Sequence, residues 1–169
     1  MKKHLIFLIT IFFFTCQDSE RVWDNPYDSN WDVDQSILIL PFDQTINIDE
    51  EITLDLNVEG LVATVFAVSM VIDYDSTIIQ PINFINGELF EGGGISFFNA
   101  VDSKIYLTIS STTNGSFNEG TLCSIKFIGK RIGSSSIQIS VDDLYLFDPN
   151  LNEYPHGDLY IGSTLITVE

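Results

Sequence analysis

Histidine, cysteine and tryptophan are nearly absent from this chain. Its 169 residues contain two of each, and His4 and Cys16 lie within the N-terminal segment. If Cys16 is modified within that segment, Cys123 has no partner for a disulfide, and zinc sites take several cysteine or histidine ligands. A serine or cysteine nucleophile would have only His156 as its base. The sequence therefore predicts a protein that is not an enzyme and has no disulfide.

Basic residues are scarce as well. Seven lysines and arginines stand against 24 aspartates and glutamates, for a formal net charge of −17. This excess repels the phosphate backbone of nucleic acids and favours cations and basic protein surfaces. Carboxylate pairs such as Asp142-Asp143 are frequent by chance in so acidic a chain, so they do not indicate a glycosidase. Nucleic acid is therefore excluded as a partner.

Long apolar runs are missing too. Residues 5–14 form an apolar segment behind Lys2 and Lys3, far shorter than the roughly 20 residues of a membrane-spanning helix. A short apolar segment behind a positive start is typical of a secretory signal peptide. The four residues that end in Cys16, FFTC, resemble the lipobox of bacterial lipoproteins, whose cysteine is acylated and becomes the first mature residue. We therefore expect residues 1–15 to be a signal peptide and Cys16 to carry lipid.

The residues behind Cys16 indicate where the lipid holds the chain. Asp18 and Glu20 resemble the export signal of some surface lipoproteins. We therefore expect a bacterial outer-membrane lipoprotein at the cell surface, in contact with the membrane only through its lipid. Residues 16–35 are polar and contain Asn25-Pro26, which favours extended or turn backbone, so we interpret them as a tether. The alternative is a signal peptide cleaved elsewhere, with Cys16 unmodified.

Residues 36–169 alternate between apolar and polar side chains with the period of two that a β-strand requires. Glycine-rich, Asn-Gly and Asp-Pro turns separate the alternating runs, and no segment has a helical period. The runs are 37–40, 52–58, 66–74, 105–110, 121–128, 137–141 and 165–168. The pattern predicts an all-β fold, a single β-sandwich or jelly roll of about eight or nine strands.

Six segments, taken in order, resemble the cohesin module. They are 66–76 (FAVSMVIDYDS), 86–89 (NGEL), 102–110 (DSKIYLTIS), 120–127 (GTLCSIKF), 142–144 (DDL) and 148–150 (DPN). Ser76 stands where the family's Tyr-Asp-Pro turn has proline. The resemblance covers roughly residues 36–169. It implies a jelly roll that binds a protein partner, a dockerin, in a cell-surface or polysaccharide-degrading assembly.

The same resemblance implies a binding face. In cohesins the dockerin lies against one flat sheet face, whose strands resemble segments at 65–74, 97–98, 104–110 and 136–141. The outward or turn side chains expected to contact the partner are Ser69, Asp73, Asp75, Tyr106, Thr108 and Ser110. Asp75 matches a turn aspartate that contacts dockerin in some cohesins. The alternative is that these are ordinary solvent-facing strand residues.

A carbohydrate-binding surface module is the alternative function. Sugar platforms use exposed aromatic rings that stack on pyranose faces. The candidates are Phe97 or Phe98, of which only one can point outward, with Tyr106 and Tyr154. Both tryptophans lie before residue 36, outside the expected domain, which counts against polysaccharide as the ligand. A third alternative is a structural role without a separate ligand.

One acidic turn has the composition of a calcium site. Asp148, Asn150, Asn152 and Glu153 offer the hard oxygen ligands that Ca²⁺ takes, although their spacing is not that of an EF-hand. Two interpretations stay open: these four residues bind calcium, or they form a polar β-turn on the surface. No other cofactor is expected.

The lipid assignment is tested by mass spectrometry of the mature protein. We expect the N-terminal fragment to begin at Cys16 and to carry the added mass of acyl chains. Cys16→Ser should remove the lipid and move the protein out of the membrane fraction. An unmodified N-terminus at another residue would contradict the assignment.

Overall fold

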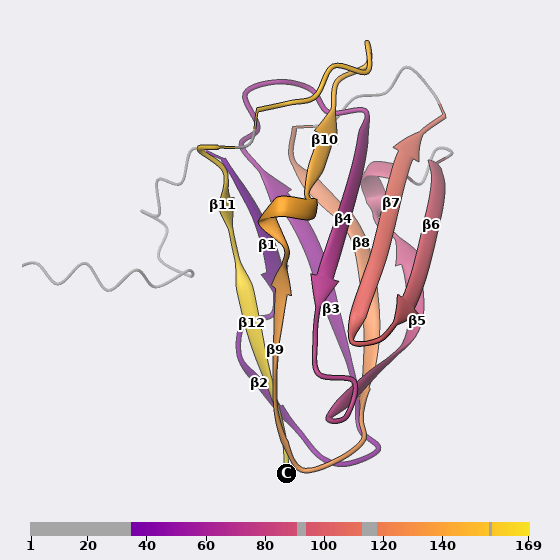
Figure 1. Ribbon diagram of the computed structural model, residues 1–169, viewed down its shortest axis with the longest axis vertical. Helices are drawn as coiled ribbons and strands as arrows, with labels where there is room; N and C mark the ends of the chain where they lie inside the picture. The colour runs from indigo at the N-terminus through magenta and orange to yellow at the C-terminus, as the bar shows by residue number, and fades with distance from the viewer. Residues whose placement is uncertain (1–34, 91–93, 113–117, 156) are drawn as a thin grey trace, which may run out of the picture. The chain divides into compact units, whose positions relative to one another are not determined.

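The computed structural model describes residues 35–90, 94–112, 118–155 and 157–169 (Figure 1). These residues form two sheets packed face to face as a β-sandwich, which confirms the predicted fold class. One sheet has five strands in the order β11-β1-β3-β8-β5, and the other has seven, in the order β2-β12-β9-β4-β7-β6 with β10 beside β4. The strands are β1 (Ser36–Leu40), β2 (Gln44–Ile46), β3 (Glu51–Glu59), β4 (Ala67–Asp73), β5 (Ile79–Asn86), β6 (Gly94–Val101), β7 (Lys104–Ser111), β8 (Gly120–Gly129), β9 (Gly133–Ile139), β10 (Tyr145–Phe147), β11 (Tyr160–Ile161) and β12 (Ser163–Val168).

Twelve strands in the described residues exceed the eight or nine expected. The additional ones are short or irregular in sequence pattern. β2, β10 and β11 have only two or three residues each, too few to show an alternation. β5 contains Pro81, and its pairing with β8 shifts register between Pro81 and Asn83. Strands of this kind form because a longer neighbour supplies their hydrogen-bond partners.

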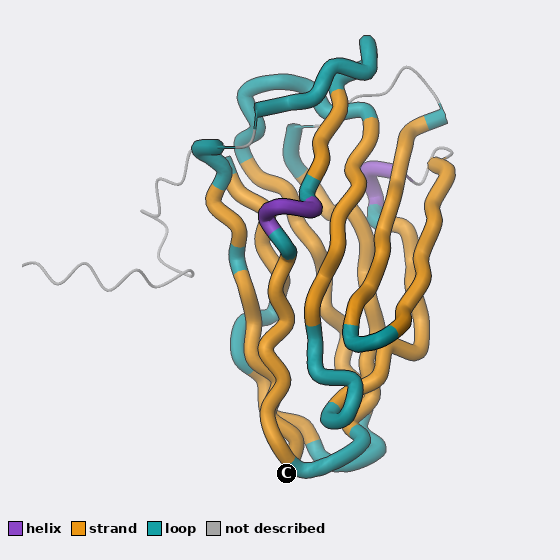
Figure 2. Tube along the Cα trace, viewed as in Figure 1, coloured by secondary structure: helices purple, strands orange, loops and turns teal. Residues whose placement is uncertain are grey.

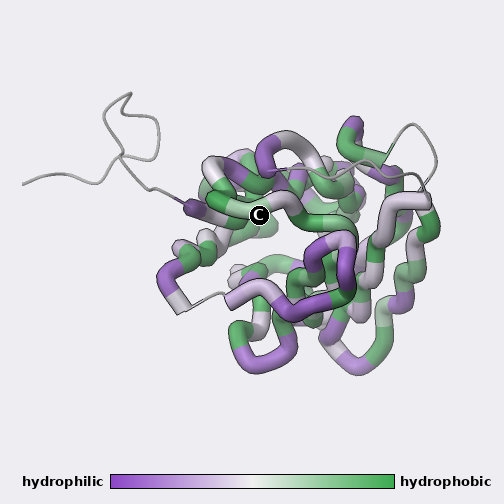
Figure 3. Tube along the Cα trace, turned by 90° about the horizontal axis from the view of Figure 1, so that it is seen from above, coloured by the Kyte–Doolittle hydropathy of each residue, from purple (hydrophilic) through white to green (hydrophobic). Residues whose placement is uncertain are grey.

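Alternate side chains of the long strands fill the space between the sheets. On β4, Val68, Met70 and Ile72 are buried, and on β7 Ile105 and Leu107 are buried. Viewed along the strands, hydrophobic and hydrophilic residues alternate along the chain (Figure 3). Burial of each such side chain contributes about 1.5–3 kcal/mol, which fixes the register of each strand because a slip by one residue would expose the whole row.

One strand departs from the expected alternation. Leu122 and Cys123 are adjacent on β8, yet both are buried. The reason is a bulge: the pairing with β3 places Leu56 opposite Cys123 and Asn57 opposite Thr121, so Leu122 is an extra residue. The alternation expected along residues 121–128 therefore breaks at Leu122. Bulges of this kind bend a strand and increase its twist.

Helical structure is limited to single turns in the described part of the chain (Figure 2). Glu88–Phe90 (η1) and Val141–Asp143 (η2) are 3₁₀ turns that link strands. Val141 thus begins a helical turn rather than ending a strand as expected. Within the same described residues, no helix is long and apolar enough to cross a membrane.

Gly87 allows the chain to leave β5 close to β8, and its replacement tests this packing. Its N–H donates to the carbonyl of Leu122 at 2.9 Å, and a Cβ at this position would overlap the backbone of Thr121. We expect Gly87→Ala to destabilise the fold by about 2–3 kcal/mol in urea unfolding. Gly157→Ala is the matched control, because a Cβ there meets nothing within 4 Å. Equal stability of the two variants would contradict this account.

Candidate binding face

The sheet formed by β4, β7 and β6 presents one continuous row of side chains to solvent on each strand. Residues directly opposite each other in an antiparallel pair point to the same side of the sheet. We call these side chains the outer face. It consists of Ala67, Ser69, Val71 and Asp73 of β4, Lys104, Tyr106, Thr108 and Ser110 of β7, and Ile95, Phe97, Asn99 and Val101 of β6. None of these side chains is buried.

Most of the residues singled out from the sequence meet on this face. Ser69 lies opposite Thr108, and their hydroxyl oxygens are 3.0 Å apart. Tyr106 lies opposite Val71, and Ser110 lies opposite Ala67. The structure thus brings together the predicted β4 and β7 residues. Whether a partner contacts them stays a prediction.

Charge on the outer face is confined to one self-neutralising pair. Lys104 Nζ lies 3.0 Å from the Asp73 carboxylate, and both side chains are about half exposed. The hydrogen bond to Asp73, together with its charge, raises the pKa of Lys104. An ion pair this exposed contributes little to stability. Its main consequence is that the face carries no net charge in a strongly acidic chain.

β6 gives the outer face an apolar border that sequence reasoning largely missed. Ile95 is 66% exposed and Phe97 is 58% exposed, and Val101 is exposed as well. The sequence contained one indication of this border, the adjacent pair Phe97-Phe98, because neighbouring strand residues point to opposite sides and one of the two rings had to face outward. Phe98 points inward and stacks on Phe84 with ring centroids 5.0 Å apart. Ile95 and Val101 follow from the same alternation once Phe97 is placed.

Asp75 lies beyond the end of β4, in the turn that follows. Its carboxylate Oδ1 accepts hydrogen bonds from the Thr77 backbone N–H at 2.8 Å and the Thr77 hydroxyl at 2.7 Å. These bonds, with a smaller contribution from Arg131, hold the pKa of Asp75 below its ordinary value. Arg131 Nη2 also donates to the Thr77 hydroxyl, at 3.1 Å. Asp75 therefore orders its own turn and stands at one end of the outer face.

Of the aromatic residues considered for sugar binding, two are placed suitably. Phe97 and Tyr106 are exposed on neighbouring strands, where Phe97 pairs with Thr108 and Asn99 with Tyr106. Tyr154 is only 7% exposed, so the expectation that it is available to a ligand is wrong. Its hydroxyl donates to the Gln35 side chain, which lets the ring pack inside without leaving a polar atom unpaired.

The acidic turn after β10 is closed by its own aspartate. Asp148 Oδ1 accepts the backbone N–H groups of Asn150 and Asn152, both at 2.8 Å, and Oδ2 accepts the Asn152 side-chain amide at 2.9 Å. Hydrogen bonds from Asn152 and Asn150 hold the pKa of Asp148 below its ordinary value. Glu153 is exposed and bridges to Phe147 through backbone. This is the polar β-turn of the second interpretation, and calcium binding stays a prediction.

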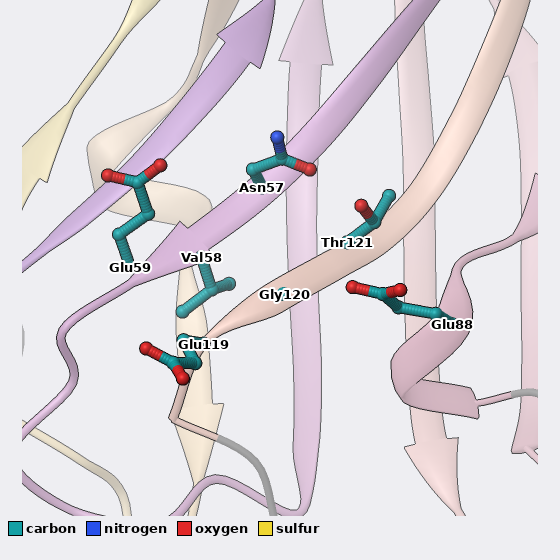
Figure 4. Close-up of a pocket in the computed structure, with 7 residues that line it drawn as sticks. All are labelled: Asn57, Val58, Glu59, Glu88, Glu119, Gly120 and Thr121. Atoms are coloured by element: carbon teal, nitrogen blue, oxygen red, sulfur yellow. The ribbon is translucent and has the colours of Figure 1, made fainter.

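A second acidic feature lies on the five-stranded sheet. A hollow of about 580 Å³ is lined by Asn57, Val58, Glu59, Glu88, Glu119, Gly120 and Thr121 (Figure 4). Glu88 reaches from η1 toward β8, and none of the described residues that line the hollow is basic. Across the described residues, no three histidine, cysteine, aspartate or glutamate side chains are close enough together to hold a metal ion.

The thiol of Cys123 is in an environment that makes it unreactive. Cys123 is buried, and loss of solvation together with the Asp55 carboxylate raises the pKa of its thiol far above the ordinary value. A protonated, buried thiol is neither a nucleophile nor a metal ligand. His156 lies outside the described residues.

The turn at Asp75 provides a titration test. Because the pKa of Asp75 is lower in the folded chain than in the unfolded one, its hydrogen bonds stabilise the fold at neutral pH and are lost as pH falls through the lowered pKa. We expect Thr77→Val to raise the pKa of Asp75 in a carbon-13 NMR titration, but not fully, since the backbone N–H still donates. Thr53→Val, on the other sheet, is the control. An unchanged pKa in Thr77→Val would refute the assignment.

Solved cohesin structures share this fold. The chain superposes on a type II cohesin domain from Acetivibrio cellulolyticus with a TM-score of 0.66 at 18% identity, covering 78% of this chain and 94% of that one. Superposition on a cohesin in a type I cohesin–dockerin complex from Clostridium thermocellum gives a TM-score of 0.65 at 16% sequence identity and covers 80% of this chain and 99% of that one. Superposition on a non-cellulosomal cohesin from the archaeon Archaeoglobus fulgidus gives a TM-score of 0.65 at 12% sequence identity and covers 80% of this chain and 91% of that one. Identities this low establish the fold alone.

The family follows from the sequence itself. A comparison with curated proteins found no match to this sequence. The family model of the cohesin domain, however, matches residues 42–155, which is more than half of the chain and includes strands β2 to β10. The chain therefore belongs to the cohesin domain family, whose members are non-catalytic binding modules.

Proposed function

We propose that this cohesin domain is held at the outer surface of a bacterium by a lipid on Cys16 and binds a dockerin-type protein through its outer face. The observation that carries the proposal is the chemistry of that face: exposed apolar and hydroxyl side chains on paired strands, with one internally neutralised charge pair. The centres of protein interfaces are depleted of charge and enriched in aromatic residues. Phe97 and Tyr106 supply the aromatic part.

The rest of the molecule favours a basic partner. The chain carries a net charge of −17, while the outer face itself is neutral. Negative charge around a neutral contact area accelerates the approach of a basic protein without placing unpaired charges in the interface. A cohesin of the Clostridium thermocellum complex has a dockerin as its partner. A dockerin-type module with basic residues around its contact helix is therefore the occupant that we propose.

A carbohydrate ligand is the second candidate, and one observation favours it. Phe97 and Tyr106 are diagonal neighbours on adjacent strands, a separation of about 7–8 Å at which two rings can serve one sugar chain. Both interpretations place the ligand on the same face. They differ in the ligand that the face binds, which is a protein in the first interpretation and a polysaccharide in the second.

The proposal is tested by titrating the purified protein with dockerin modules encoded in the same genome, in a calorimeter. We expect one of them to bind and Val71→Asp to weaken that binding at least thirtyfold, because the new carboxylate would be buried without a partner at the centre of the contact. Val71 lies opposite Tyr106, in the middle of the face. Thr53→Asp, on the outer side of the five-stranded sheet, should bind like the parent protein.

Two results would overturn the proposal. One is equal loss of affinity in Val71→Asp and Thr53→Asp while both variants keep their melting temperature. The other is retardation in a polysaccharide affinity gel that Tyr106→Ala and Phe97→Ala abolish, with no dockerin binding. That second result would establish the carbohydrate function instead.

A further inference from the structure

The edges of the two sheets are protected to very different degrees. An edge strand exposes unpaired backbone N–H and C=O groups, which attract additional strands unless the edge is short, irregular or charged. β11 has two residues and β2 has three. β5 carries Pro81 and a register shift. β6 has eight residues, no proline and no charged residue, and its register with β7 is continuous from Gly94 to Val101.

The hairpin geometry identifies the free backbone groups of β6. Asp102 and Ser103, with φ of 51° and 62°, form a two-residue turn of type I′, so the N–H and C=O groups of Val101 face Lys104. Alternation along the strand then directs the backbone groups of Ser96, Phe98 and Ala100 away from β7. No strand of the described residues pairs with that side of β6. In Figure 1, β6 lies at the border of its sheet.

The side chains along this edge are suited to contact with a further strand. Ile95 and Phe97 are exposed on the outer side. On the inner side, Phe98 stacks on Phe84, and the small residues Ser96 and Ala100 beside it are exposed. An added strand would therefore meet apolar neighbours on both sides. It would also gain the free backbone hydrogen bonds.

The negative charge of the chain determines which kind of segment can pair with the free edge of β6. Every lysine and arginine in the described residues already contacts this domain: Lys104 pairs with Asp73, Lys126 with Glu51, Lys130 with the Ser76 carbonyl and Arg131 with the Thr77 hydroxyl. Over the whole chain, 24 acidic residues stand against 7 basic ones. A second copy of the chain would bring the same negative charge to the edge, whereas a basic segment is attracted to it.

We propose that the free edge of β6 takes an extended segment of a partner protein as an additional strand. The segment is apolar over about five residues and has lysine or arginine on both sides of that stretch. Main-chain hydrogen bonds supply the affinity in this mode, and side chains at alternate positions supply specificity. The site is distinct from the outer face, since it uses the backbone of Ser96, Phe98 and Ala100.

The probe is a nine-residue peptide with alternating valine and threonine at its centre and two lysines at each end, added to the full-length protein. We expect it to bind at least tenfold more tightly than the same peptide with glutamates at its ends. Hydrogen exchange at the amides of Ser96, Phe98 and Ala100 should slow at least tenfold. The amides of Phe97 and Asn99, which already pair with β7, should change little.

Ala100→Pro and Ala100→Val form the matched pair of variants. Proline removes an N–H that β7 does not use, so the hairpin is retained, but the added strand loses a donor. Valine keeps the N–H. We expect Ala100→Pro to lose at least tenfold in peptide affinity and Ala100→Val to bind like the parent protein, with slow exchange at Phe97 showing that both are folded.

Three results would overturn this inference: unchanged exchange at the three edge amides, equal binding by the two variants, or a dimer in sedimentation with those amides protected before peptide is added. The last would show that a second copy fills the edge. Val71→Asp separates this site from the proposed dockerin contact, because it should leave peptide binding intact.

Discussion

Burial of alternate residues on β4 and β7 is the constraint on which the rest of the molecule depends. Val68, Met70 and Ile72 face the core, so Ser69, Val71 and Asp73 must face solvent. The same alternation on β7 places Tyr106 beside Val71. The core thus determines the composition of the outer face through register alone. Side chains on that face are free to serve recognition, because changing them costs the core nothing.

The acidic residues of the chain are neutralised in some parts of the structure and not in others. Three glutamates surround the hollow on the five-stranded sheet without any basic side chain, whereas Asp73 on the outer face is neutralised by Lys104. A neutral, partly apolar surface within a negative molecule is the arrangement on which the proposed preference for a basic partner depends. Net charge of this size also disfavours pairing between copies, which matters for a strand as exposed as β6.

The sequence predicts long, regular strands well and irregular ones poorly. The rows on β4 and β7 follow from period-two alternation, which places Ser69 and Thr108 on the solvent side, but that these two lie opposite each other depends on the pairing of β4 with β7. The bulge at Leu122 does not, because its cause is a mismatch with β3 elsewhere in the chain. The inward side of β6 cannot be told from its sequence, because hydrophobic residues occur on both of its sides. Tyr154 was expected to be exposed because the residues around it are typical of a polar turn, but it is buried. In each case a partner distant in sequence decides the outcome.

Strand β6 belongs to both proposed contacts, and this couples them. Phe97 contributes its side chain to the outer face, while its neighbours Phe98 and Ser96 direct their backbone groups to the free edge. A strand added at the edge would extend the sheet and place new side chains next to Phe97, at the border of the face. It would also restrict the motion of an edge strand that otherwise pairs on one side only. Linkage requires that whatever effect the added strand has on a ligand of the face, the ligand has on the strand to the same degree. A partner that carries both a docking module and a basic extended segment would reveal this coupling as a difference between its affinity and the sum of its two contacts.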